Sequence, residues 1–362
     1  MHISGKAAFA AILTVIVATG ALACGGPYEV RPGDTLSGIA RAEIGSFFAY
    51  QSIFEANRHL IGSNPDRIQA GMTLQLPCIG EPVNWAVLPS ASTVAALQQV
   101  TDIQIVDIRR PSDLADGVIP GAVSVPYDTW RVPAGHPNET LLDGELSRIV
   151  GEAGLRPDQP VLIVHARSDM MDTGRAAMVY WLLKSTGFET IGILKDGHQG
   201  WTDAGLPVAA APAVPDPYLA DLTFSNRWRA DEMDVYGIAT SQITGFLLDA
   251  RPQHMFAKFD DAGKPLATTL PNARNAPIGP LMAAFGSEVP IETAVRAVAD
   301  HLQRHNANWK TGEVITFCQT GELGALSWFY ASELAGLDNM LLYPESVAGW
   351  ADGGGRLFAG LD

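Results

Sequence analysis

A single cysteine follows an apolar run near the end of the chain, in the stretch EVITFC at residues 313–318. The run from Val314 to Phe317 predicts a buried strand, and apolar residues resume at helical spacing after the segment CQTGELG. A thiol between a strand and a helix faces unpaired backbone N–H groups and the positive end of the helix dipole, which favour the thiolate. Cys318 is therefore a candidate nucleophile. The alternative is a small buried residue, which is the common fate of a free cysteine.

The residues after the cysteine can form a cradle around its sulfur. They are Gln319, Thr320, Gly321, Glu322, Leu323 and Gly324. The two glycines permit the positive φ angles of a tight loop, and a helix expected to begin near Ala325 would add its dipole. Glu322 is unusual here, because a carboxylate beside the sulfur would raise the thiol pKa and weaken the binding of a dianion. Alternatively, its side chain points into solvent, as most loop glutamates do.

Length and composition indicate a protein of two or three packed domains. The chain has 362 residues, of which 47% are hydrophobic and 17% charged, which is typical of globular domains. Its net charge of −15 argues against nucleic acid or an anionic membrane as a partner. Neither a C-x-x-C pair nor histidines at ligand spacing are present, so no metal site and no cofactor are expected.

The first residues have the order of a secretory signal peptide. Residues 1–23 contain one lysine, an apolar centre and a final Ala-Leu-Ala, which predicts cleavage and export to the periplasm and not a membrane span. A lipoprotein modified at Cys24 is the less favoured alternative, because Ala-Leu-Ala fits the usual lipobox poorly. In an oxidising compartment Cys24 and Cys78 can close a disulfide and leave Cys318 free.

Residues 28–77 show the pattern of a small β-α-α-β unit. A short strand from Tyr28 to Arg31 precedes a helix that Asp34 or Thr35 can cap. A second helix is expected over Tyr50–Asn57 and a closing strand over Thr73–Leu76.

The motifs V-x-x-G-D-T-L-S-x-I-A, I-F-E-A-N and I-x-A-G-M-T-L-Q-L-P in this segment resemble those of a LysM domain, assigned to residues 24–80. The resemblance implies binding of peptidoglycan or another glycan that contains N-acetylglucosamine, in a groove between the loops at 33–36 and 64–68. The glycan-binding candidates are Gly33, Asp34, Thr35, Leu36 and Ile68. The alternative is a spacer or a protein-contact module.

The rest of the chain repeats itself. IQIVDIRRPSDL at 103–114 matches GFLLDARPQHMF at 245–256, and PVLIVH at 160–165 matches EVITFC at 313–318. A matching proline turn and a later Gly-Trp complete each copy. Short apolar strands that alternate with helices predict an α/β fold with a doubly wound parallel sheet in each copy. The copies span 84–208 and 221–362, and the Ala/Pro-rich residues 209–220 form a semi-stiff linker.

In order, these motifs resemble a tandem-rhodanese sulfurtransferase of the thiosulfate or 3-mercaptopyruvate type. In that family the C-terminal copy usually carries the nucleophile, and here His165 stands at the first copy's equivalent of Cys318. The resemblance implies a Cys318 persulfide that passes sulfur from a small donor to a thiol or cyanide. A related phosphatase would need an arginine six positions after the cysteine, where this chain has Gly324.

The resemblance also suggests where positive charge reaches the donor. Arg227, in SNRWRAD, and Arg251, in the Asp-x-Arg motif, are the substrate-binding candidates, although Arg251 can equally pair with a structural carboxylate. His136 lies in a segment that could reach the cleft. The predicted function is an exported sulfurtransferase held at cell-wall glycan. The alternative is a non-catalytic scaffold with inactive rhodanese folds.

Overall fold

The computed structural model describes residues 23–24, 27–40, 43, 50–62, 64–76, 78–79, 87–98, 101–131, 143–284, 291–305 and 312–360. Its contacts divide the chain into two compact units, Met1–Asn84 and Trp85–Asp362. The predicted signal peptide, except for Ala23, and His136 lie outside the described residues. Within the described ranges, no helix combines the length and the hydrophobicity needed to cross a bilayer.

The first unit has the expected β-α-α-β order. Strands β2 (Pro27–Glu29) and β3 (Thr73–Gln75) pair antiparallel, and helices α1 (Leu36–Ile39), α2 (Tyr50–Ala56) and α3 (Arg58–Ile61) lie between them in sequence. The short α3 and the 3-10 turn Pro65–Arg67 extend the predicted pattern. Thr35 caps α1 by accepting a hydrogen bond from the Gly38 N–H at 3.0 Å.

One buried asparagine ties the helices of this unit to its sheet. The amide nitrogen of Asn57 donates to the carbonyls of Ile53 at 2.7 Å and Gln75 at 2.8 Å, and its Oδ1 accepts from the Gln75 N–H. Both polar atoms of the side chain are therefore satisfied inside the core. Leu36 and Leu74 are buried in the same core.

A second, two-residue pairing joins the ends of this unit. Strand β1 (Ala23–Cys24) runs antiparallel to β4 (Cys78–Ile79), with Cys24 directly opposite Cys78. Opposed residues of an antiparallel pair have Cα atoms about 4.5–5.5 Å apart. That separation lies in the range that a disulfide spans.

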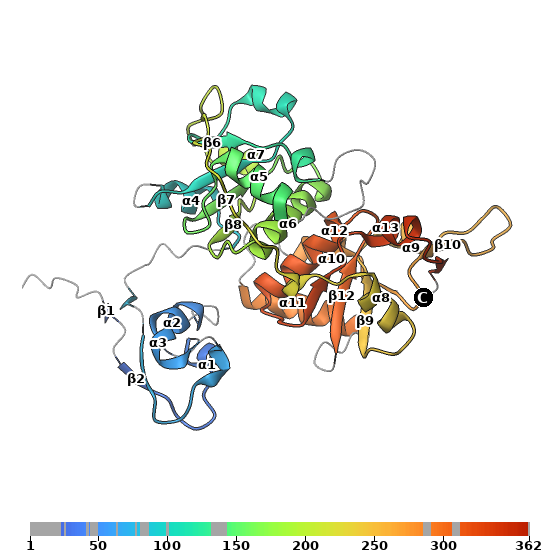
Figure 1. Cartoon of the computed structure of the whole chain (residues 1–362), viewed down its shortest axis with the longest axis horizontal. Coiled ribbons are helices and arrows are strands. Elements are labelled where there is room, and N and C mark those ends of the chain that lie inside the picture. Colours follow the sequence, from blue (N-terminus) through green and yellow to red (C-terminus); the bar gives the residue numbers. More distant parts are fainter. Residues whose placement is uncertain are drawn as a thin grey trace, which may run out of the picture. The chain divides into compact units, whose positions relative to one another are not determined.

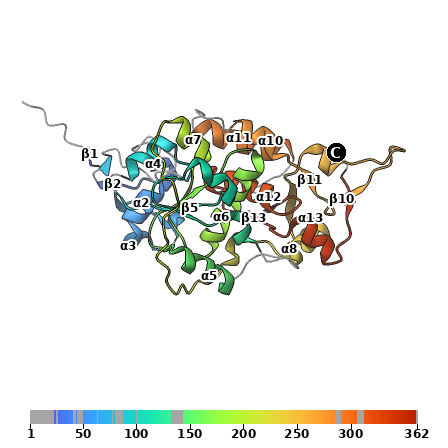
Figure 2. The same cartoon turned by 90° about the horizontal axis from the view of Figure 1, so that it is seen from above.

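The second unit contains two equivalent parallel sheets with helices on both faces (Figures 1 and 2). In the first copy the strand order is β6-β5-β7-β8. The strands are β5 (Gln104–Asp107), β6 (Ala122–Ser124), β7 (Val161–Val164) and β8 (Ile191–Ile193), and the helices are α4 (Ala91–Leu97), α5 (Asp143–Ala153), α6 (Met170–Ser185) and α7 (Gly197–Asp203). Every residue of β7 is buried, as expected of a central parallel strand.

The second copy repeats this order as β11-β9-β12-β13. Its strands are β9 (Gly245–Asp249), β11 (Arg274–Asn275), β12 (Glu313–Phe317) and β13 (Met340–Leu342). Its helices are α8 (Glu232–Ala239), α9 (Gln253–Phe256), α10 (Ile278–Ala284), α11 (Ile291–Arg304), α12 (Glu322–Trp328) and α13 (Ser346–Asp352), and a π-helical turn, Phe329–Leu334, continues α12. A separate strand pair, β10 (Ala267–Thr269) and β14 (Phe358–Ala359), lies outside this sheet.

The predicted linker is bound to the first copy along much of its length. Ala209 exchanges backbone hydrogen bonds with Val118, and the Ala213 N–H donates to the Ala122 carbonyl. Further along, the Tyr218 N–H donates to the Gly151 carbonyl. The segment is thus an extended strap on the first copy, and its Ala/Pro composition suits that conformation.

The two copies pack on each other through α6 and α12, which lie side by side in Figure 1. Gly174 in α6 lies against the backbone of Glu322, where a Cβ atom would come within 2.9 Å of the Glu322 carbonyl oxygen. Farther along, the Tyr180 hydroxyl and the Lys184 ammonium both bind the Glu333 carboxylate, at 2.7 and 2.9 Å. This contact places the start of α12, and with it the cysteine loop, against the first copy.

Candidate active site at Cys318

Cys318 lies directly after strand β12, with its sulfur inside a ring of backbone N–H groups. The Gly321 N–H donates to Sγ at 3.1 Å, and the N–H groups of Thr320 and Gly324 also act on the thiol. The Cys318 N–H itself donates to Ser346 Oγ at 3.1 Å, which fixes the start of the loop. Such a concave set of N–H donors binds anions.

Gly321 is the residue that lets this loop close. Its φ of +108° lies in the region that side chains avoid, and an added Cβ would come within 2.6 Å of both the Met178 side chain and the Pro344 carbonyl oxygen. Helix α12 begins one residue later, at Glu322, and not near Ala325 as the sequence suggested. The earlier start brings the first turn of the helix, with Glu322, into the loop itself.

The expectation that this position favours the thiolate is wrong in its net direction. Burial and the charge of Glu322 raise the pKa of the Cys318 thiol above its ordinary value, although the N–H groups of Gly324, Thr320 and Gly321 lower it. Cys318 is 2% exposed, so desolvation is the dominant cause. The N–H groups around the sulfur therefore offset only part of the effect of burial and of Glu322.

Glu322 does not point into solvent. Its side chain is buried, and both carboxylate oxygens have partners. Oε1 accepts from the Tyr127 hydroxyl at 3.0 Å and from Arg131 Nη1 at 3.2 Å, and Oε2 accepts from Thr320 Oγ1 at 2.7 Å. The carboxylate therefore faces the junction of the two copies and takes part in the active loop.

Two of these partners come from the first copy and were missed in the sequence. Tyr127 and Trp130 are buried in the 3-10 turn Tyr127–Trp130, which holds Arg131 immediately after it. Arg131 also donates to the Thr320 carbonyl at 2.9 Å. In the sequence, the segment that contains Tyr127 and Arg131 was singled out only for His136. The feature that could have indicated them is the position of this segment, which could reach the cleft.

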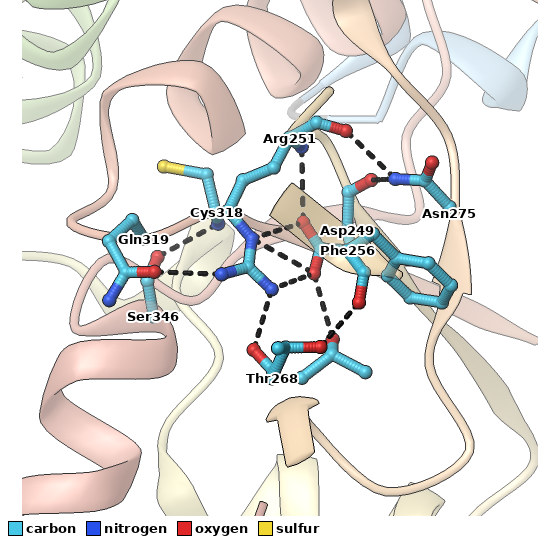
Figure 3. A network of polar contacts seen from close by, with 9 residues as sticks. Asp249, Arg251, Phe256, Thr268, Asn275, Cys318, Gln319 and Ser346 are labelled. Carbon is cyan, nitrogen blue, oxygen red and sulfur yellow. Dashed lines mark hydrogen bonds and ion pairs between the residues drawn. The ribbon is translucent and has the colours of Figure 1, made fainter. Parts of the chain in front are cut away.

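Arg251 binds a carboxylate and the active loop, as Figure 3 shows. Its guanidinium pairs with Asp249, whose Oδ2 lies 2.6 Å from Nη2, and its Nη1 donates to Gln319 Oε1 at 2.7 Å. The sulfur of Cys318 points away from this guanidinium in Figure 3. Arg251 therefore braces the loop through Gln319 in this structure, and Arg109 pairs with Asp107 in the same way in the first copy.

The other candidate arginine, Arg227, is exposed and lies over the ring of Trp228, with 5.2 Å between the guanidinium carbon and the ring centroid. Its neighbour Arg229 pairs with Glu345 at 2.7 Å, next to the Ser346 that holds Cys318. Arg229 is thus the arginine of this segment that the structure connects to the active loop.

The first copy has His165 and a carboxylate at the equivalent loop, next to a pocket whose lining includes His165, Asp172 and Arg175. His165 is buried, its Nε2 lies 3.1 Å from the Leu194 carbonyl, and burial lowers its pKa to about 4. The Ser168 N–H donates to Asp172 Oδ2 at 2.8 Å. In the first copy, an N–H group of this loop is therefore bound to the carboxylate of Asp172. In the second copy, the N–H groups of the equivalent loop surround the Cys318 sulfur.

The predicted glycan-binding residues of the first unit differ in their exposure. Gly33 and Thr35 are exposed, whereas Leu36 is buried in the core and offers only its backbone to a ligand. Asp34 accepts from the Arg31 N–H at 2.7 Å and from the Tyr28 hydroxyl at 2.9 Å, so it stabilises the turn. Ile68 is half-buried against the same core.

Family models match both parts of the chain. A LysM domain matches residues 28–77, and a rhodanese-like domain matches residues 90–204. The chain therefore carries a LysM domain and a rhodanese-like domain. The rhodanese match falls on the first copy, and the equivalent sheet order extends the same fold to the second copy, which holds Cys318.

Proteins similar to this chain include some named as sulfurtransferases. A thiosulfate sulfurtransferase of Corynebacterium glutamicum is 24% identical over 73% of this chain and 87% of its own length. A provisionally named thiosulfate sulfurtransferase of Synechococcus elongatus is 29% identical over 48% of this chain, and the match spans 56% of that relative's length. The LysM part is similar to the potassium binding protein Kbp of Escherichia coli, with 44% identity over 14% of this chain and 33% of Kbp.

Solved structures share the rhodanese fold across both copies. The 3-mercaptopyruvate sulfotransferase SseA from Escherichia coli has a TM-score of 0.58 at 19% identity, over 72% of this chain and 98% of its own. A structure of EanB with a cysteine persulfide and ergothioneine has a TM-score of 0.62 at 16% identity, over 76% of this chain and 71% of its own.

Proposed function

We propose that this rhodanese transfers a sulfane sulfur from a small donor to a thiol or cyanide through a persulfide on Cys318. The observation that carries the proposal is the set of loop N–H groups around the Cys318 sulfur, with Gly321 N at 3.1 Å. These groups suit the anionic persulfide, whose outer sulfur bears the charge. The persulfide in the EanB structure is consistent with this use of the fold.

The reaction runs in two substitutions. The Cys318 thiolate attacks the donor's outer sulfur and a new S–S bond forms. The bond from that sulfur to the rest of the donor breaks, and its electron pair leaves with sulfite from thiosulfate, or with the enolate of pyruvate, which then takes a proton, from 3-mercaptopyruvate. The acceptor thiolate or cyanide then attacks the outer sulfur, and Cys318 leaves as a thiolate. Because burial and Glu322 raise the Cys318 pKa, we expect the first step to quicken as pH rises from neutral.

The loop also bears on the choice of donor. The carboxylate of Glu322 raises the pKa of the Cys318 thiol although it is paired with Arg131. Because a carboxylate in the loop opposes a dianion more than a monoanion, we expect donors of low charge, such as an organic persulfide, to be better than dianionic thiosulfate. Between the two donors that name this family, we propose 3-mercaptopyruvate, with one negative charge, as better than thiosulfate.

We propose further that the protein is exported and held at peptidoglycan. The LysM match over residues 28–77 supports glycan binding, and the exposed Gly33 and Thr35 offer contacts for it. Export rests on the signal-like residues 1–23, and the opposed Cys24 and Cys78 suit an oxidising compartment.

The decisive experiment is the intact mass of the purified protein after incubation with 3-mercaptopyruvate, thiosulfate or an organic persulfide. We expect one added sulfur, lost on addition of cyanide and absent in Cys318→Ser. Cys78→Ser is the matched control, since it removes a thiol outside the rhodanese unit and should load normally. No sulfur with any donor would favour the alternative of a non-catalytic scaffold.

A further inference from the structure

The carboxylate of Glu322 poses a problem for a loop that must carry negative charge. It lies in the first turn of α12, within the same loop as the Cys318 sulfur, and its side chain is 8% exposed. Water therefore screens it poorly, and its charge opposes both the thiolate and the persulfide. A sulfurtransferase that retains this residue needs a nearby positive charge.

Arg131 supplies that charge from the other copy. Its Nη1 contacts Glu322 Oε1 at 3.2 Å and the Thr320 carbonyl at 2.9 Å, and the side chain is 21% exposed. Despite its own burial, Tyr127 and Glu322 raise the pKa of Arg131, and Cys318 also acts on it. The guanidinium thus stays charged against the loop.

Other charged groups around the loop are already paired with each other. On the strand β9 side, Arg251 is bound to Asp249, and on the α13 side Arg229 is bound to Glu345. On the α6 side Arg175 is bound to Asp172. Tyr127 is neutral, because burial and Glu322 raise its pKa well above the ordinary value. Among the described residues, Glu322 is the charged group whose effect on the Cys318 pKa is resolved, and Arg131 is its ion-pair partner.

We propose that Arg131 of the first copy is the counter-charge of Glu322, and that it keeps the Cys318 loop able to hold a thiolate or persulfide. Arg131 is a positioning residue in this role, since it acts through Glu322 and the Thr320 carbonyl. The proposal deepens the sulfurtransferase function and rests on it for its biological meaning. It also gives the first copy, which has no cysteine in its loop, a part in the reaction.

The test measures the rate at which iodoacetamide alkylates Cys318 between pH 6 and 11, in the full chain. For Arg131→Gln we expect the rate profile to move up by about one pH unit, which is about tenfold slower alkylation near neutral pH. For Glu322→Gln we expect a shift of similar size in the opposite direction. Arg131→Lys keeps the charge and should remain within about threefold of the parent.

The double variant separates charge from structure. In Arg131→Gln/Glu322→Gln both charges are gone, so we expect the profile to return to within about threefold of the parent. Arg148→Gln, which removes an exposed arginine of the same copy, should leave the profile unchanged. The proposal is overturned if Arg131→Gln matches the parent, or if the double variant stays as slow as Arg131→Gln.

This experiment uses no sulfur donor, so its outcome is independent of the proposed activity. If the parent takes up no sulfur while the charge variants shift as expected, the sulfurtransferase function fails and the counter-charge remains. If the parent forms a persulfide but the variants do not shift, only the role of Arg131 is lost.

Discussion

At the scale of single residues, the two copies differ in what their loops hold. The second copy surrounds the Cys318 sulfur with N–H groups, whereas the first copy gives its Ser168 N–H to the carboxylate of Asp172. The two loops therefore differ in more than the replacement of a cysteine by His165. In the first copy an N–H donor of the loop is already bound to a carboxylate.

A substitution tests this view of the first copy. We expect His165→Cys, made in a Cys318→Ser background, to take up no sulfur. The carboxylate of Asp172 already binds the Ser168 N–H and would repel the anionic persulfide. Intact mass after incubation with the donor that loads the parent gives the answer. Sulfur at the new cysteine would show that the loop accepts an anion in spite of Asp172.

At the scale of elements, the contact of α6 with α12 sets the geometry of the active loop. Gly174 lies where a Cβ would come within 2.9 Å of the Glu322 carbonyl oxygen. We expect Gly174→Val to lower the free energy of unfolding by about 1–3 kcal/mol, which is the usual cost of overpacking, and to slow turnover. Gly144→Val is the control, because a side chain there meets open space.

Urea unfolding and steady-state rates of the two valine variants give the comparison. The coupling of helix packing to the loop is refuted if Gly174→Val unfolds at lower urea but turns over like the parent.

The strand pair β1 and β4 leads to a prediction about the LysM unit. Cys24 stands opposite Cys78, and a disulfide between them would close almost the whole unit into one loop. On the chain-entropy estimate, a loop of this length adds about 3–4 kcal/mol. We expect non-reducing peptide mapping of exported protein to find a Cys24–Cys78 peptide, and reduction to weaken retention on peptidoglycan. A lipid mass on Cys24 would instead establish the lipoprotein alternative.

At the scale of the whole molecule, two buried histidines make the stability depend on pH. The pKa of His165 and that of His301 are each lowered to about 4, in both cases mainly by burial. The unfolded chain binds protons at these residues near pH 6.5, so the native state is fully stabilised above that value and loses stability as the pH falls toward 4.

Between pH 7 and 5 we expect a loss of about 2 kcal/mol for each histidine, measured by urea unfolding. Variants His165→Asn and His301→Asn should flatten this pH dependence, each by its own share. His59→Asn, an exposed site, is the control. An equal pH dependence in all four proteins would mean that other groups control acid stability.

Much of this architecture is predictable from the sequence, because it depends on local patterns. The repeated strands, the β-α-α-β unit and the cysteine loop each follow from apolar runs and turn residues close together in the chain. The direction of Glu322 does not, because it depends on Arg131, 191 residues earlier and in the other copy. The effect of Glu322 on the Cys318 pKa was one of the two alternatives drawn from the sequence, but the larger effect of burial was not foreseen, because burial arises from packing that no local motif encodes.

The contact of Arg131 with Glu322 also bears on how the gene has evolved. A duplication begins with two interchangeable halves, and either can later be deleted or moved. Here the cysteine that we propose as the nucleophile lies in one half, and the group that we propose as the counter-charge of Glu322 lies in the other. Under that division we expect neither half to work alone as an enzyme, and we expect Glu322 in one copy and Arg131 in the other to change together.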